Sequence, residues 1–78
     1  MIRYGLRMSS NTPSAGAVIR EARRRVGLSQ AELGRRAEVT QSVVSAYESG
    51  ARQPSVPTLT RLVDAAGLRL DLQVRRSA

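Results

Sequence analysis

The sequence predicts a mainly α domain, a bundle of four short helices that ends in one β-strand. Apolar residues recur at helical spacing in four successive segments, and each segment follows a serine or threonine that can cap a helix. Glycines close three of these segments, at Gly27, Gly50 and Gly67. Beyond Gly67 the apolar residues recur at every second position, which is the period of a strand.

The composition limits what the chain can do. Its 78 residues suffice for one small domain, and a domain of this size buries only about 60% of its unfolded surface, so it gains much from dimerising. The chain has no cysteine and no histidine, which excludes disulfides and thiolate metal sites and most nucleophile–base pairs. We therefore expect no enzyme, no catalytic or metal site, no cofactor and no small-molecule ligand.

The charge of the chain points to a polyanionic partner. The formal net charge is +7, from 13 basic and 6 acidic residues. Every basic residue is arginine, whose planar guanidinium can donate two parallel hydrogen bonds to a phosphate group. Use of arginine alone also fits a GC-rich genome. No apolar run approaches the roughly 18 residues of a membrane span, and no signal segment opens the chain, so we expect a cytoplasmic protein without a membrane partner.

Residues 1–13 are expected to form an N-terminal arm or short strand followed by a linker. Met1–Met8 alternates apolar residues with arginine and glycine, a weak strand pattern, and a disordered basic tail is the alternative. Residues 9–13 are polar and without periodicity. Ser14 can then cap a helix that runs to about Val26 and carries one apolar stripe: Ala15, Val18, Ile19, Ala22 and Val26. Arginines 20, 23, 24 and 25 lie largely off this stripe, either as a solvated face or as phosphate contacts.

The stretch Leu28–Gly50 predicts two short helices joined by a tight turn. Ser29 and Glu32 have the spacing of a capping box, and Thr40 can cap the second helix. Val39 is expected to be a buried plug in the turn. Helical spacing turns these side chains inward: Ala31, Leu33 and Ala37 in the first helix, and Val43 or Val44 with Tyr47 in the second. Two helices meeting through a short turn in a basic chain indicate a helix-turn-helix.

The segments LSQAEL, TQS and YESG in this stretch resemble the Cro/repressor-type (XRE) helix-turn-helix family, and the resemblance runs from about Val18 to Gly67. It implies a lambda-repressor-like bundle in which residues 14–67 are the DNA-binding domain of a transcription regulator, here a repressor. The chain departs from the family at Glu38. Glycine is usual at this position of the turn, because a backbone with positive φ costs little energy only for glycine. Either Glu38 carries backbone strain or the turn differs.

The chain after Gly50 predicts a fourth helix and a strand. Ser55 can cap the helix, Pro57 is tolerated in its first turn, and its buried stripe is Leu59, Leu62, Val63 and Ala66. Residues 68–78 then form a dimerisation strand and a basic tail, with one apolar face: Leu68, Leu70, Leu72 and Val74. A strand needs a partner, which is the same strand of a second subunit, the Met1–Met8 strand, or both. A frayed tail is the remaining alternative.

An XRE domain followed directly by such a strand resembles the HipB-like antitoxins, which dimerise through C-terminal strands and repress their own operon. This narrower resemblance implies a bacterial homodimer, an autoregulating antitoxin with a HipA-like kinase toxin as its protein partner. The alternative is a protein-interaction module that mainly sequesters this partner, with DNA binding secondary. A non-specific nucleoid or RNA binder is supported by charge alone.

The family match also implies positions for DNA contacts. Gln41, Ser42 and Ser45 occupy base-reading positions, and Val43 either touches a thymine methyl or packs inward. The expected phosphate contacts are Gln30, which also braces the base-reading glutamine, Thr40, Arg52, Arg35 and Arg24. Tyr47 and Glu48 are expected to be structural. A two-fold dimer places two recognition helices about 34 Å apart and therefore predicts double-stranded DNA with a palindromic operator as the partner.

Overall fold

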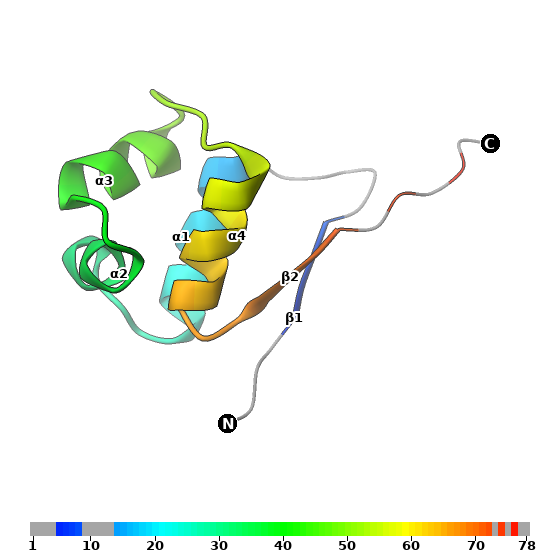
Figure 1. Cartoon of the computed structure of the whole chain (residues 1–78), viewed down its shortest axis with the longest axis horizontal. Coiled ribbons are helices and arrows are strands. Elements are labelled where there is room, and N and C mark those ends of the chain that lie inside the picture. The colour runs from blue at the N-terminus through cyan, green and yellow to red at the C-terminus, as the bar shows by residue number, and fades with distance from the viewer. Residues whose placement is uncertain (1–4, 9–13, 73, 75, 77–78) are drawn as a thin grey trace.

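The structure is a computed structural model that describes residues 5–8, 14–72, 74 and 76. Its elements in chain order are β1 (Gly5–Met8), α1 (Ala15–Arg25), α2 (Gln30–Ala37), α3 (Gln41–Ser49), α4 (Val56–Ala65) and β2 (Arg69–Leu72). Figure 1 shows α1 and α4 packed together at the centre, with α2 and α3 on one side of them and the two strands on the other. The prediction of a mainly α class, with four helices and a C-terminal strand, is confirmed.

Each helix begins where a local capping signal stands in the sequence. Ser14, Ser29, Thr40 and Ser55 each accept a hydrogen bond from the backbone N–H three residues further on, at 3.0–3.2 Å. At Ser29 the capping box is complete, because the Ser29 backbone N–H donates to Glu32 Oε1 at 3.0 Å. This backbone hydrogen bond lowers the pKa of the Glu32 carboxyl. A cap of this kind contributes about 1 kcal/mol to helix stability.

The core lies between the four helices. Its buried apolar residues are Val18, Ile19, Ala22, Leu28, Leu33, Ala37, Val44, Tyr47, Leu59, Leu62, Val63, Ala66 and Leu68. Between the two alternatives for α3, Val44 is fully buried, whereas Val43 is only partly buried against the core.

Three sequence expectations about the core need correction. Val26 is 38% exposed because α1 ends at Arg25, so the helical spacing no longer turns this side chain inward. Ala31 is exposed because the buried face of α2 passes through Leu33, Gly34 and Ala37, and a residue two positions before Leu33 lies on the opposite face of a helix. Val39 is half-buried and packs against the core instead of filling it.

The turn between α2 and α3 has a left-handed residue at Glu38, with φ 61° and ψ 39°. Of the two alternatives that the sequence left open, backbone strain at Glu38 is therefore the correct one. This conformation costs a residue with a Cβ roughly 1–2 kcal/mol. The turn also packs tightly against α2, since a Cβ on Gly34 would lie 2.7 Å from the Val39 carbonyl oxygen.

The two strands pair in parallel, with Gly5 beside Arg69 and Met8 beside Leu72. The partner that the structure shows for the C-terminal strand is thus the N-terminal segment of the same chain. Leu68 precedes β2 and has no exposed surface, so it belongs to the core of its own chain and not to a dimer contact as predicted. Met1–Tyr4, the linker at 9–13 and Gln73 lie outside the described residues.

Candidate nucleic-acid interface

The helix α3 presents two different faces. Its inner face consists of Val44, Tyr47 and Glu48, all buried. Gln41, Ser42 and Ser45 are exposed on the opposite face, near the N-terminal end of the helix. In Figure 1 the helix lies on the outside of the bundle, away from the strands. The predicted base-reading residues therefore share one solvent-facing surface on a helix that the core holds in place.

The polar groups on this surface are free to bind a ligand. Within the described part of the chain, no hydrogen bond engages the side chains of Gln41, Ser42 or Ser45. The Gln41 amide therefore keeps both its donors and its acceptor, which is the set needed to pair with one adenine edge. Val43 differs from these three because it packs partly against the core. Of the two alternatives for Val43, this placement favours packing against the core over contact with a thymine methyl.

The orientation of α3 depends on a buried carboxylate, that of Glu48, whose side chain has no exposed surface. Arg23 of α1 donates to both of its oxygens, from Nε to Oε2 at 2.8 Å and from Nη2 to Oε1 at 3.0 Å. Arg20 Nε and Gln30 Nε2 each donate to Oε1 at 3.3 Å. Glu48 thus joins α1, α2 and α3. No buried side-chain N or O atom of the described residues lacks a hydrogen-bond partner.

The electrostatics of this cluster keep Glu48 ionised. Burial raises the pKa of its carboxyl, but hydrogen bonds from Arg23, Gln30 and Arg20 outweigh burial and leave the pKa below its usual value. The hydrogen bond to Glu48 in turn raises the pKa of Arg23, against the effect of burial. The arginines and the carboxylate of this network are therefore charged throughout the neutral pH range. Ion pairs join α1 to α3, and the hydrogen bond from Gln30 joins α2 to α3.

Glu48 was expected from the sequence to be structural, but the residues that pair with it were not identified there. A signal was present in the spacing, because Glu48 follows the buried Val44 by four residues. That interval places a carboxylate on the inner face of the helix, where it needs a cation. In α1, Arg23 likewise follows the buried Ile19 by four residues. Which arginine would reach Glu48 depends on how the two helices pack.

Gln30 hydrogen-bonds to Glu48 and not to Gln41, the glutamine that it was expected to brace. It is half-buried at the start of α2 and donates to Glu48, and among the described residues it makes no hydrogen bond to Gln41. The hydrogen bond to Glu48 uses one hydrogen of the Gln30 side-chain amide and leaves the other available. The backbone N–H of Gln30 is also available, because the first N–H groups of a helix have no acceptor within the helix. These are donor groups of the kind that bind phosphate oxygens.

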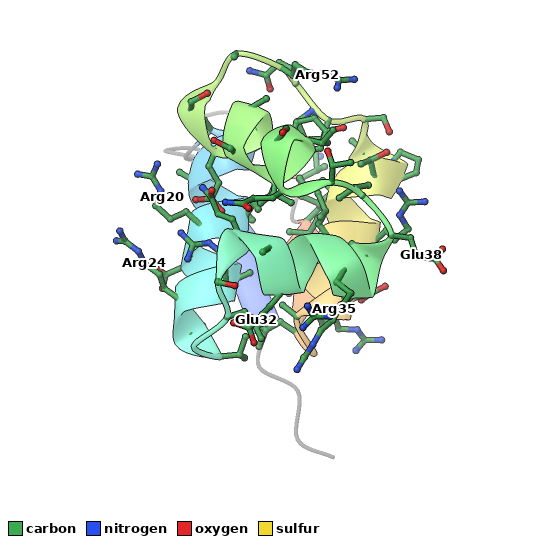
Figure 2. The ribbon with its side chains drawn as sticks, turned by 90° about the vertical axis from the view of Figure 1, so that its left-hand side faces the viewer. Arg20, Arg24, Glu32, Arg35, Glu38 and Arg52 are labelled. Carbon is green, nitrogen blue, oxygen red and sulfur yellow. The ribbon has the colours of Figure 1, made fainter. Side chains whose placement is uncertain are left out.

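The other expected phosphate contacts are spread around the bundle. Thr40 Oγ1 accepts the α3 cap bond, which leaves its hydroxyl hydrogen free to donate. The guanidinium carbon of Arg52 lies 5.8 Å from the centroid of the Tyr47 ring, a cation–π distance. Figure 2 shows Arg24 extending from one side of the bundle and Arg52 from the end beyond α3. Arg35 extends from the side of α2 that faces away from α3, so the structure does not bring it to the surface of Gln41.

This fold and this surface define a DNA-binding domain of the kind found in transcription regulators. A family model described as helix-turn-helix matches residues 19–73. The match covers more than half of the chain, and the chain therefore belongs to the XRE-type helix-turn-helix family. Neither a curated protein nor a solved structure matches it. None of the described helices is both long and apolar enough to cross a membrane.

Proposed function

We propose that this protein is a homodimeric repressor that reads a palindromic operator through α3. The observation that carries the proposal is the exposed polar face of α3, Gln41, Ser42 and Ser45, opposite a face fixed in the core. An α-helix fits the major groove of DNA, where Gln41 pairs with one adenine by accepting from N6 and donating to N7. The two serines are short and permissive, so DNA shape supplies further selectivity.

Phosphate contacts would position this helix in the groove. Gln30 and Thr40 bring free donors at the starts of α2 and α3, and Arg24 and Arg52 add exposed cations. Such contacts carry no sequence information, but they fix the register of the protein on the duplex. The logarithm of the binding constant falls linearly with the logarithm of the salt concentration, and each neutralised phosphate makes this slope steeper by about 0.9.

A second copy of the chain would bind at β2. Val74 is fully exposed and Leu72 is 49% exposed, while Leu70 is half-buried. In the described residues β2 pairs with β1 alone, which leaves its other edge open for main-chain hydrogen bonds. Figure 1 places the strands on the side of the bundle away from α2 and α3, so pairing there leaves α3 uncovered. A two-fold dimer of this kind matches a palindrome with half-sites about 34 Å apart.

The finer proposal is that the repressor is an autoregulating antitoxin with a kinase-like toxin as partner. It is supported by the strand that follows the helix-turn-helix domain directly. The exposed Leu72 and Val74 also support the alternative, a module whose main role is to hold a partner enzyme inactive. A toxin gene beside this one, and a complex of the two purified proteins, would favour the antitoxin.

The test is fluorescence anisotropy with DNA from the protein's own upstream region and with a scrambled duplex, at two salt concentrations. A preference of roughly a thousandfold or more for the upstream DNA is expected of a specific repressor. Equal and steeply salt-dependent binding to both duplexes would contradict operator recognition, because phosphate contacts alone do not distinguish sequences.

A further inference from the structure

The sequence left Arg20 of α1 open as either a solvated residue or a phosphate contact, and the structure shows that its side chain is held in an unusual way. Its Nε donates to Glu48 Oε1 at 3.3 Å, while 47% of its side chain remains exposed. Among the described residues, its two terminal nitrogens have no hydrogen-bond partner. The guanidinium is therefore anchored at one edge and open to solvent at the other.

The Glu48 carboxylate does not need Arg20 for neutralisation. Arg23 donates to both oxygens of this carboxylate and also to the Leu28 carbonyl oxygen, and only 17% of its side chain is exposed. One arginine balances one carboxylate, so Arg20 adds a positive charge that the cluster leaves uncompensated. Its single bond is also longer than either bond from Arg23 to Glu48.

The position of Arg20 matches the surface that would face DNA. Arg20 Nε and Gln30 Nε2 bind the same oxygen of Glu48, so the Arg20 guanidinium lies beside the first residue of α2. Arg24 follows Arg20 by four residues on α1, and Figure 2 shows both side chains extending from the same side of the bundle. Three donor groups from α1 and α2 are thus gathered along one side of the molecule.

We propose that Arg20 binds a backbone phosphate of double-stranded DNA and that Glu48 is the residue that positions it. The open edge of a guanidinium donates in parallel to two phosphate oxygens. Because Glu48 already restrains the side chain, Arg20 loses less rotamer freedom on binding than a solvated arginine does. This inference rests on the proposed function, and it adds to that function a phosphate contact built on a buried carboxylate.

The test compares Arg20→Gln with Arg25→Gln on the upstream and scrambled duplexes, across salt concentrations from about 50 to 200 mM. Arg25 is a matched control, since it lies on the same helix, is 44% exposed and pairs with Glu21. Both substitutions remove one positive charge. We expect Arg20→Gln to reduce the salt slope by about 0.9 on both duplexes, and Arg25→Gln to leave it unchanged. Arg20→Lys, which keeps the charge, should restore most of the slope.

The outcomes separate this inference from the proposed function. If Arg20→Gln lowers the melting temperature but has the same slope as Arg25→Gln, Arg20 only completes the Glu48 network and the inference is overturned. Operator preference in the wild-type protein would in that case leave the repressor proposal intact. If the wild-type protein binds neither duplex, both proposals are overturned together.

Discussion

The helix-turn-helix and the strand pair are held together by very different means. Hydroxyl caps begin α2 and α3, buried apolar residues join them to the core, and Glu48 ties α3 to α1 and α2. The strands are four residues each, and β2 contributes only a half-buried Leu70 to the core, whereas Leu72 is half exposed. The helix-turn-helix is thus stabilised within one chain, while the strand pair leaves apolar side chains exposed.

The largest effect is expected from Glu48→Gln, which breaks the ion pairs that join α3 to α1. Arg23 would be left largely buried without its carboxylate, so the unfolding free energy should fall by roughly 3 kcal/mol, measured by urea denaturation at pH 7. The control Glu21→Gln removes an exposed partner of Arg25 and should cost about 0.5 kcal/mol or less. Equal losses in the two variants would contradict a special role for Glu48.

The same substitution should alter the acid stability of the protein. The pKa of Glu48 is lower in the folded chain than its ordinary value, so its contribution is present above the unfolded pKa, near 4.5. That contribution is lost as the pH falls through the lower folded pKa. Stability measured between neutral and acid pH should therefore decline less in Glu48→Gln than in the wild-type protein. A parallel decline in both would mean that Glu48 is not the titrating group.

The next effect sharpens the division within α3 between its inner and outer faces. Gln41→Ala should cost about 1–3 kcal/mol in binding to the specific site and leave non-specific binding nearly unchanged. Its melting temperature should match the wild-type value, because Gln41 is exposed. Gln53→Ala makes the same chemical change outside α3 and should not alter the ratio of the two affinities. An equal loss on both duplexes would show that Gln41 does not contact bases.

A smaller effect is expected at the turn between α2 and α3, where Glu38 is strained. Glu38→Gly should raise the unfolding free energy by about 1 kcal/mol, because glycine adopts a positive φ without the clash of a Cβ. In a domain of this size that corresponds to roughly 4–8 °C in melting temperature. Glu38→Ala removes the carboxylate but keeps the Cβ, so no such gain should appear. A similar gain in both variants would assign the effect to charge.

The smallest effect on folding, but a large one on association, is expected from Leu72→Asp combined with Val74→Asp. Both side chains are exposed in one chain, so the unfolding free energy of the subunit should change by about 0.5 kcal/mol or less. Two carboxylates in a dimer contact would oppose association, so light scattering should show a shift from dimer to monomer. Operator affinity should weaken as well. An unchanged mass would place the dimer contact elsewhere on the molecule.

Much of the fold could be predicted because its signals are local. A capping serine or threonine acts on a backbone N–H three residues away, and the positive φ at Glu38 follows from the short turn between two helices. Such short-range interactions need no knowledge of the rest of the molecule, so the helix starts were expected, and strain at Glu38 was one of the two alternatives that the sequence left open. Gln41, Ser42 and Ser45 were placed at base-reading positions by the family resemblance, and all three are exposed in the structure.

Only the tertiary structure decided which distant residues meet. Arg20, Arg23 and Gln30 reach Glu48 across 18 to 28 residues of sequence, and periodicity alone does not show which side chains of α1 and α2 meet this carboxylate. The parallel pairing of β1 with β2, and the burial of Leu68 in its own chain, likewise depend on where α4 delivers the C-terminal segment. Sequence patterns determine which face of an element is apolar, but packing in three dimensions determines what covers that face.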